Sequence, residues 1–338
     1  MPTIHNSDLY ELFETLDEQE LRDLRRFLLS PYFNQREDVL RLFEYLRECQ
    51  KKKKQAFWLD KETVYRAVYS EAKSLDEKQL NLVLYQLSAA IRHYWSIQKA
   101  EGMHFGTQLQ LLQTLRKKRL KTLFVKELEK TYKELDAQPY RNAAYHAQLA
   151  MLHNEYYEWY AYQQRESDVR LQELSEEWAY FTILTTLRQA CLMHSHQAVV
   201  RREYDFKLVK EVLAHIEQHD YQGQPAILLY YHSYKALTAT IEEGHTHFDA
   251  SKQLLKAHGH LFPSSELRNM TINAINYCMK RVQSDFKLRS EALDLYKFAL
   301  ERAVLLENDV LPAYTYKNIT TAALGIGDAA WARQFIEQ

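Results

Sequence analysis

Histidine is the residue whose spacing comes closest to a chemical site in this sequence. Imidazole nitrogens are common ligands of zinc, so two histidines separated by one residue are candidates for metal binding. Three such His-x-His pairs occur: His194/His196, His245/His247 and His258/His260. On an α-helix, however, side chains two positions apart point roughly 200° away from each other and cannot share one ion, although in a loop they could. We therefore expect solvated or locally hydrogen-bonded histidines, and no metal site.

The middle pair lies in a run, His245 to Asp249, that resembles the start of the zinc motif of the metallo-β-lactamases. That motif requires a further histidine directly after the aspartate, and this chain has Ala250 there. Its ligands also leave the end of a β-strand, whereas nothing in the surrounding pattern predicts a strand. We therefore do not expect a zinc hydrolase.

Other signatures of catalysis are missing from the sequence. It contains no Gly-x-Ser-x-Gly, no GxxxxGK[ST] and no GxGxxG pattern. Its cysteines, Cys49, Cys191 and Cys278, are far apart and are typical of reduced thiols in packed helices. The adjacent carboxylates at Glu176-Glu177 are typical of a solvated helix surface. We expect a protein that is not an enzyme and binds no cofactor.

The composition favours helices and narrows the classes of partner. Among 338 residues there are only 7 Gly and 6 Pro, the residues that tight turns and phosphate-binding loops need, so we predict an all-α protein. Lys and Arg number 44 against 45 Asp and Glu, which removes a global attraction to nucleic acid or anionic membranes, although not a local one. No apolar run could span a bilayer and the N-terminus does not resemble a signal peptide. We expect a cytoplasmic protein that does not bind membranes.

The N-terminal region, residues 1–102, is predicted to be a compact helical unit. Asp17 and Glu20 form a capping-box-like helix start, and Ser30-Pro31 stops that helix. The expected helix starts are Asp17, Arg36, Asp60 and Asp76. The remainder of the chain, residues 103–338, is predicted to be a helical-repeat region.

Two basic runs make nucleic acid a second candidate partner. They are Lys51 to Lys54 and Arg116 to Lys121. Glu127 and Glu129 interrupt the helix that follows the second run, and no aromatic residues interleave with the lysines, as base stacking would need. A nucleic-acid-binding regulator that uses the N-terminal unit is therefore the alternative function, and the less favoured one.

The middle of the chain predicts long helices that pack on several sides. One helical pattern continues from Phe105 to about Leu135, and Ala137-Gln138-Pro139 ends it. Helices are expected next over Ala143 to Arg165 and Leu171 to Val199, both with apolar residues around most of their circumference. Such helices are usually sandwiched between neighbours, so we predict an antiparallel pair inside a stack.

The clearest repeats lie within residues 230–338. Three segments each predict a helix, a turn and a second helix: 230–263, 265–306 and 311–338. Small residues recur in the second helices about 40 residues apart, at Ala250, Ala292 and Ala332. Large ones follow on the same face at Leu254, Tyr296 and Ile336, and further alanines lie at Ala257 and Ala299. A small residue beside a large one lets two helices approach closely, so we expect stacked helix pairs.

These segments resemble degenerate tetratricopeptide (TPR) repeats. The resemblance rests on Gly327-Asp328 at a helix–helix turn, Ala332, Tyr316, Ile319, and on Tyr234, Leu237, Ala250, Leu254, Ala257 and Pro263. It departs from the family at Thr238 and His245, where glycines are common. The resemblance implies a right-handed solenoid whose concave wall would carry Lys235, Tyr314, Lys317 and Thr321. Residues 30–34 and 187–204 are also similar to uncharacterised helical bacterial proteins.

The expected function is a non-catalytic protein–protein interaction scaffold. Its concave wall would hold a peptide or a partner helix, with Lys235 and Lys317 pairing with acidic groups. The last helix, from Ala329, has no polar cap, so either the chain continues beyond Gln338 or another copy or a partner covers this end; we expect the first, a truncated chain. The identity of the partner and the oligomeric state stay open.

Overall fold

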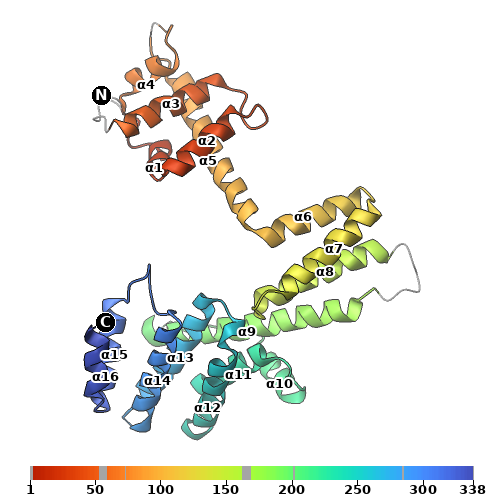
Figure 1. The fold of residues 1–338 in the computed structure, drawn as a ribbon, viewed down its shortest axis with the longest axis vertical. Helices are drawn as coiled ribbons and strands as arrows, with labels where there is room; N and C mark the ends of the chain where they lie inside the picture. Colours follow the sequence, from red (N-terminus) through yellow and green to blue (C-terminus); the bar gives the residue numbers. More distant parts are fainter. Residues whose placement is uncertain are drawn as a thin grey trace. The chain divides into compact units, whose positions relative to one another are not determined.

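The protein is all-α, as the composition predicts. The structure, a computed structural model, describes residues 3–52, 59–72, 74–161, 169–200, 202–283 and 285–337. Within these ranges there are sixteen α-helices and no β-strand, only isolated bridges at Thr3–Asp60 and Glu307–Val310 (Figure 1). None of the described helices combines the length and apolar character that crossing a membrane requires. Lys53, Lys54 and Tyr162 to Arg165, which belong to the basic run and the aromatic helix of the sequence analysis, lie outside the described residues.

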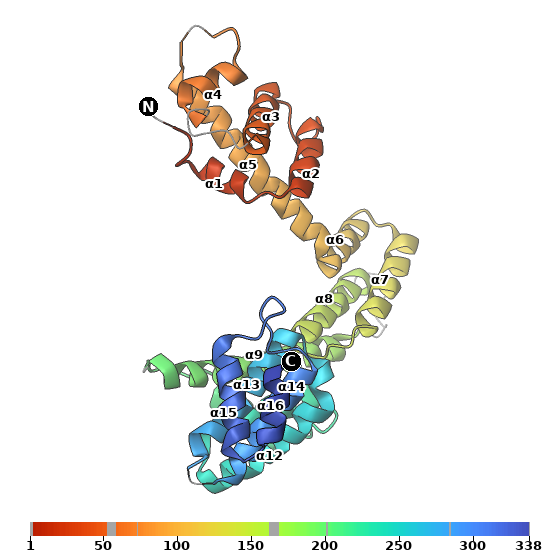
Figure 2. The same ribbon diagram turned by 60° about the vertical axis from the view of Figure 1, so that its left-hand side comes forward.

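The chain divides into two compact units, Met1–Gln108 and Leu109–Gln338. The division expected from the sequence falls between residues 102 and 103. The first unit contains α1 (Asp8–Glu14), α2 (Glu18–Leu29), α3 (Glu37–Lys51), α4 (Lys61–Val68) and α5 (Glu77–Gly102). In it, α5 packs against α1, α2 and α3, and α4 packs against α3 (Figure 2).

The helix starts of the first unit follow local capping rules. The Asp17 carboxylate accepts a hydrogen bond from Glu20 N, and the Glu20 carboxylate accepts one from Asp17 N, at 2.8 and 3.0 Å. The side chains of Asp60 and Asp76 likewise cap α4 and α5, and Ser30 ends α2 before Pro31. These predictions from sequence are therefore confirmed.

The second unit contains ten complete helices among its described residues. They are α7 (Lys121–Asp136), α8 (Ala143–Tyr160), α9 (Leu171–Val200), α10 (Val209–Gln218), α11 (Pro225–Thr238), α12 (Ile241–His258), α13 (Ser264–Arg281), α14 (Lys287–Glu301), α15 (Ala313–Gly325) and α16 (Ala329–Glu337). Before them, α6 (His104–Lys117) begins in the first unit and ends in the second. A short 3₁₀ helix, Gly259–Leu261, follows α12.

The prediction of one helical run from Phe105 to Leu135 is wrong, because the chain turns between α6 and α7. Arg119 adopts a left-handed conformation with φ 58°, and Leu120 N donates to Leu115 O at 3.0 Å. This is the hydrogen-bond pattern of a Schellman C-cap, which usually carries glycine at the left-handed position. With arginine there instead, the sequence offers no Gly or Pro to mark the turn.

Neighbouring helices of the second unit pack in pairs. The pairs are α8 with α9, α11 with α12, α13 with α14, and α15 with α16. Successive pairs also touch, through α12 with α13 and α14 with α15 (Figure 1). The long helix α9 additionally packs against α10 and α11.

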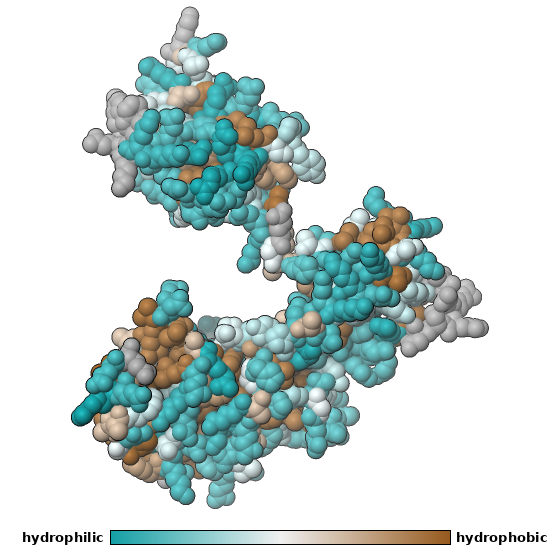
Figure 3. Space-filling model, viewed as in Figure 1, coloured by the Kyte–Doolittle hydropathy of each residue, from teal (hydrophilic) through white to brown (hydrophobic). Residues whose placement is uncertain are grey.

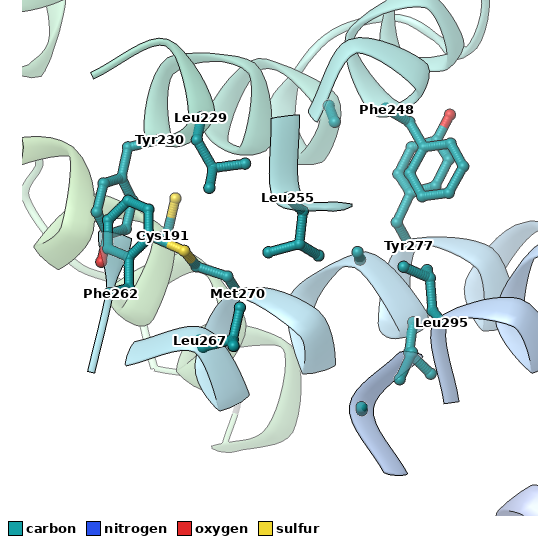
Figure 4. Packing of buried hydrophobic residues seen from close by; sticks show 14 of the residues in the cluster. Cys191, Leu229, Tyr230, Phe248, Leu255, Phe262, Leu267, Met270, Tyr277 and Leu295 are labelled. Carbon is teal, nitrogen blue, oxygen red and sulfur yellow. The ribbon is translucent and has the colours of Figure 1, made fainter. Parts of the chain in front are cut away.

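The main core of this unit joins α9, α11, α12, α13 and α14. Cys191 of α9 lies beside Tyr230 of α11 and Met270 of α13 (Figure 4). At the other end of the same view, the rings of Phe248 and Tyr277 stack with centroids 4.6 Å apart. Two polar contacts tie α9 to α13: the Ser195 hydroxyl donates to Asn273 Oδ1 at 2.8 Å, and Arg188 lies 3.4 Å from the Glu266 carboxylate.

The repeated small residues are buried in only two of the three second helices. Ala292 and Ala332 are 0% and 1% exposed, whereas Ala250 is half-buried. In α12 the next residue, Ser251, is buried instead, and its hydroxyl lies 2.9 Å from the Ser233 hydroxyl of α11. The expected equivalence of Leu254, Tyr296 and Ile336 is also wrong, since Tyr296 is buried and Ile336 is 52% exposed. Likewise Ala257 is exposed while Ala299 is buried.

The turn between α15 and α16 matches the sequence expectation at Gly327. This residue has φ +85°, a conformation that L side chains rarely adopt, and Asp328 N donates to Ala323 O at 3.0 Å. The Asp328 carboxylate then accepts from Trp331 N and starts α16. The glycine thus ends one helix and the aspartate begins the next.

Candidate functional site

Helix α15 presents one exposed face that holds three of the four residues predicted to bind a partner. Tyr314, Lys317 and Thr321 lie at positions i, i+3 and i+7, and all three are exposed, Tyr314 by 76%. Leu324, 56% exposed, follows in the same spacing. The opposite face of α15 is buried through Ile319, Ala322 and Ala323. The structure therefore brings these three predicted residues together.

The position of α15 is fixed by α14 and α16. Leu293 of α14, Ala323 of α15 and Ala332 of α16 form a small buried cluster. Tyr316 stacks on Phe335 of α16 with ring centroids 5.3 Å apart, and Phe335 stacks on Trp331 at 5.2 Å. Both hydrophobic and hydrophilic residues reach the surface at the end of the unit that holds α15 and α16 (Figure 3). The exposed face is thus carried by a well-packed helix.

Lys235, the fourth predicted residue, is engaged within the chain. Its ammonium donates to the Glu217 carboxylate of α10 at 3.0 Å, and the Tyr231 hydroxyl donates to the same oxygen at 2.9 Å. The hydrogen bond from Lys235, followed by that from Tyr231, lowers the pKa of Glu217. No hydrogen bond or ion pair of the described residues joins Lys235 to α15. The structure therefore does not bring it together with the other three.

The chain's own helix α9 covers part of the surface formed by the first helices of the pairs. Leu187 and Cys191 of α9 are buried in the core with α11 and α13, and Ser195 bonds to Asn273 of α13. Consequently, α11 and α13 meet α9 where the TPR resemblance implied an open wall. Helix α15, by contrast, is also the first helix of its pair, and one of its faces is widely exposed.

The His-x-His pairs do not converge on a shared site. His247 lies 2.8 Å from His232, nitrogen to nitrogen, and His245 lies 3.7 Å from Asp249. His196 instead meets the Tyr204 hydroxyl, at 2.7 Å. Among the described residues, no group of three or more His, Cys, Asp or Glu side chains has an arrangement that could hold a metal ion.

The contact between His232 and His247 joins α11 to α12, and sequence spacing alone does not reveal it. Because the two Nδ1 atoms are 2.8 Å apart, one ring donates a hydrogen bond to the other, which requires a neutral acceptor ring. Burial, followed by the neighbouring His247, lowers the pKa of His232 to about 4. Burial also lowers the pKa of His247, which Lys235 lowers further and Glu243 and Glu217 raise. The pair is therefore held in its uncharged form.

This pair predicts that the second unit loses stability in mild acid. In the unfolded chain a histidine gains its proton near its ordinary pKa of about 6.5, whereas folded His232 does so only near pH 4. The unfolded state thus binds more protons between these values, and stability falls as pH drops from about 6.5 to about 4. We expect His232→Asn to flatten this part of the curve by roughly 1–2 kcal/mol, after discounting for partial solvent access. Urea unfolding at a series of pH values measures it, with the exposed His260→Asn as control. Parallel curves for wild type and His232→Asn would contradict the prediction.

The second unit also buries two carboxylates that sequence reasoning missed. Glu155 of α8, 3% exposed, accepts a hydrogen bond from Arg116 Nε of α6 at 2.8 Å, and the same guanidinium reaches Glu158 at 3.3 Å. Glu266 of α13 accepts from the amide of Asn142, the residue that caps α8, at 3.0 Å. Both carboxylates are fully engaged in joining helices, so they act as structural groups.

Comparisons with protein-family models, curated proteins and solved structures give no match for this chain.

Proposed function

We propose that the second unit is a non-catalytic protein–protein interaction scaffold. Its helix pairs form a TPR-like, right-handed repeat, and the exposed face of α15 contacts a peptide or a partner helix. The observation that carries the proposal is the stripe formed by Tyr314, Lys317 and Thr321, continued by Leu324. Tyrosine is enriched at protein interfaces because it offers a large contact area with few rotatable bonds.

The packing order of the helices supports the repeat part of the proposal. Each pair contacts the next through the second helix of one and the first helix of the following one, α12 with α13 and α14 with α15. In stacked repeats, such nearest-neighbour contacts generate an extended surface for binding. A face on the first helix of a pair is the usual location of a bound peptide in the family that the sequence resembles.

A reducing compartment fits the cysteines. Cys49, Cys191 and Cys278 are all free thiols and all buried. Oxidising compartments favour paired cysteines, especially in secreted chains. A cytoplasmic location is therefore part of the proposal.

Affinity purification with the whole chain, followed by calorimetric titration of the recovered stoichiometric partner, tests the proposed surface. We expect Tyr314→Ala combined with Lys317→Glu to weaken binding at least about tenfold, since an exposed aromatic and its neighbouring charge act as an anchor. Both side chains are exposed, so the variant should keep its thermal stability.

The matched control is Lys210→Glu, a charge reversal at an exposed position of α10. Lys235→Gln is a separate test of α11, because the Glu217 contact already occupies this lysine. If the α15 variant binds its partner as tightly as the wild type does, α15 is not the binding face.

A further inference from the structure

The turn between α6 and α7 concentrates positive charge in a chain that is nearly neutral overall. No acidic residue occurs between Glu101 and Glu127. The cations of this stretch are Arg116, Lys117, Lys118, Arg119, Lys121 and Lys126. The net charge of the whole chain is −1, so this is a local departure from the balance.

Arg116 is neutralised, but the four cations at the turn are not. The Arg116 guanidinium forms ion pairs with Glu155 and Glu158 of α8. Glu127, on the next turn of α7, pairs with Lys130. Lys117, Lys118, Arg119 and Lys121 are all exposed and form no ion pair with the described residues. Their charges therefore face solvent without compensation.

The backbone of the turn adds to this positive surface. Arg119 occupies the left-handed C-cap position, with φ 58°, where glycine would be less strained. Helix α7 then begins without a side-chain cap and without an acidic residue in its first turn. The N–H groups of its first turn are the positive end of the helix dipole, and they lie beside the same cations.

Two leucines are exposed among these charges. Leu120 is 42% exposed between Arg119 and Lys121, and Leu123 is 50% exposed in the first turn of α7. Hydrophobic and hydrophilic residues lie side by side at this corner of the unit (Figure 3). Cations that surround exposed aliphatic side chains are typical of surfaces that meet anionic lipid, where the charges pair with headgroups and the apolar groups enter the boundary of the acyl region.

Although the overall charge balance led us to expect no membrane contact, we propose that the local charge of the α6–α7 turn binds the surface of an anionic phospholipid bilayer. Lys117, Lys118, Arg119 and Lys121 would contact the headgroup phosphates and carboxylates, while Leu120 and Leu123 insert at the interface. A nucleic acid would satisfy the four cations equally well, but its phosphate backbone offers nothing to the leucines. The exposed leucines therefore favour lipid. This surface is separate from the α15 face, and the inference does not depend on the proposed scaffold function.

Sedimentation of the full chain with vesicles tests the proposal. We expect binding to phosphatidylcholine vesicles that contain about 30% phosphatidylserine, weakening as salt rises, and none to pure phosphatidylcholine. Lys118→Glu with Lys121→Glu should reduce binding at least about tenfold, since each cation near the surface contributes about fivefold. Leu120→Ser with Leu123→Ser should also reduce binding about tenfold.

Matched variants separate these effects from misfolding. Lys210→Glu with Lys256→Glu reverses two exposed charges elsewhere in the unit and should bind vesicles nearly as the wild type does. Arg119→Gly relieves the left-handed conformation, so it should raise the melting temperature while weakening vesicle binding about fivefold.

Three outcomes overturn the proposal. They are a wild type that fails to bind the phosphatidylserine vesicles, vesicle binding that survives the leucine substitutions, and equal loss in the Lys210/Lys256 control. A wild type that binds duplex DNA at low salt but not the vesicles would assign the turn to nucleic acid instead.

Discussion

Replacement of Arg116 by alanine is expected to lower the free energy of unfolding of the second unit by about 3–5 kcal/mol. The guanidinium is the charged partner of Glu155, whose side chain is 3% exposed on α8. Without it, a buried carboxylate remains whose hydrogen-bond partner among the described residues is the Gln113 amide, at 3.4 Å. An unpaired buried charge costs far more than a lost surface contact. Urea unfolding followed by circular dichroism measures the loss.

Two further variants show whether the buried charge is the cause. Among the described residues, Lys130 of α7 forms long, largely exposed ion pairs with Glu127 and Glu134, at 3.8 and 3.9 Å, so Lys130→Ala should change stability by less than about 0.5 kcal/mol. Replacing both partners, with Arg116→Met and Glu155→Leu together, should recover most of the loss, because no unpaired charge remains. If the double variant is as unstable as Arg116→Ala, the cost comes from packing and not from charge.

Truncation of Phe248 to alanine is expected to cost about 3–5 kcal/mol. This ring of α12 is 1% exposed and stacks on Tyr277 of α13. It fills the contact between two successive helix pairs, where a cavity could not close without moving both helices. Thermal and urea unfolding give the measurement.

The matched control is Phe286→Ala, at a phenylalanine that is 64% exposed before α14. Its removal should change stability by less than about 1 kcal/mol, including its contact with the Arg289 guanidinium, 4.7 Å from the ring. Equal losses in the two variants would show that α12 and α13 are not held together by this stack.

Most helix boundaries could be predicted because local chemistry sets them. Asp17, Asp60 and Asp76 cap the helices that follow them, and Pro31 follows the end of α2. The turn at Arg119 could not be predicted, because an arginine takes the conformation that the rules assign to glycine. The prediction that Ala250 is buried also failed, because the packing of α12 on α11, and not the repeat spacing, determines which residue is buried.

The candidate site could likewise be predicted only where the spacing within one helix determines it. Tyr314, Lys317 and Thr321 share a face because they are three and four residues apart in one helix, so the sequence alone predicts it. Lys235 could not be judged from spacing, since its partner Glu217 lies on α10 and reaches it only after the helices pack. The contact of His232 with His247 likewise requires the pairing of α11 with α12.

The packing of helix α9 determines which helices of the second unit are expected to unfold together. In a simple array each pair touches only its neighbours, so segments can detach one at a time. Here a single 30-residue helix packs against α8, α10 and α11 and bonds to α13. We therefore expect α8, α10, α11 and α13 to unfold together with α9 as one cooperative unit. Helices α15 and α16, which contact the rest of the unit through α14, are expected to unfold locally before it. The helix that carries the exposed Tyr314 therefore lies outside the group of helices that α9 holds together.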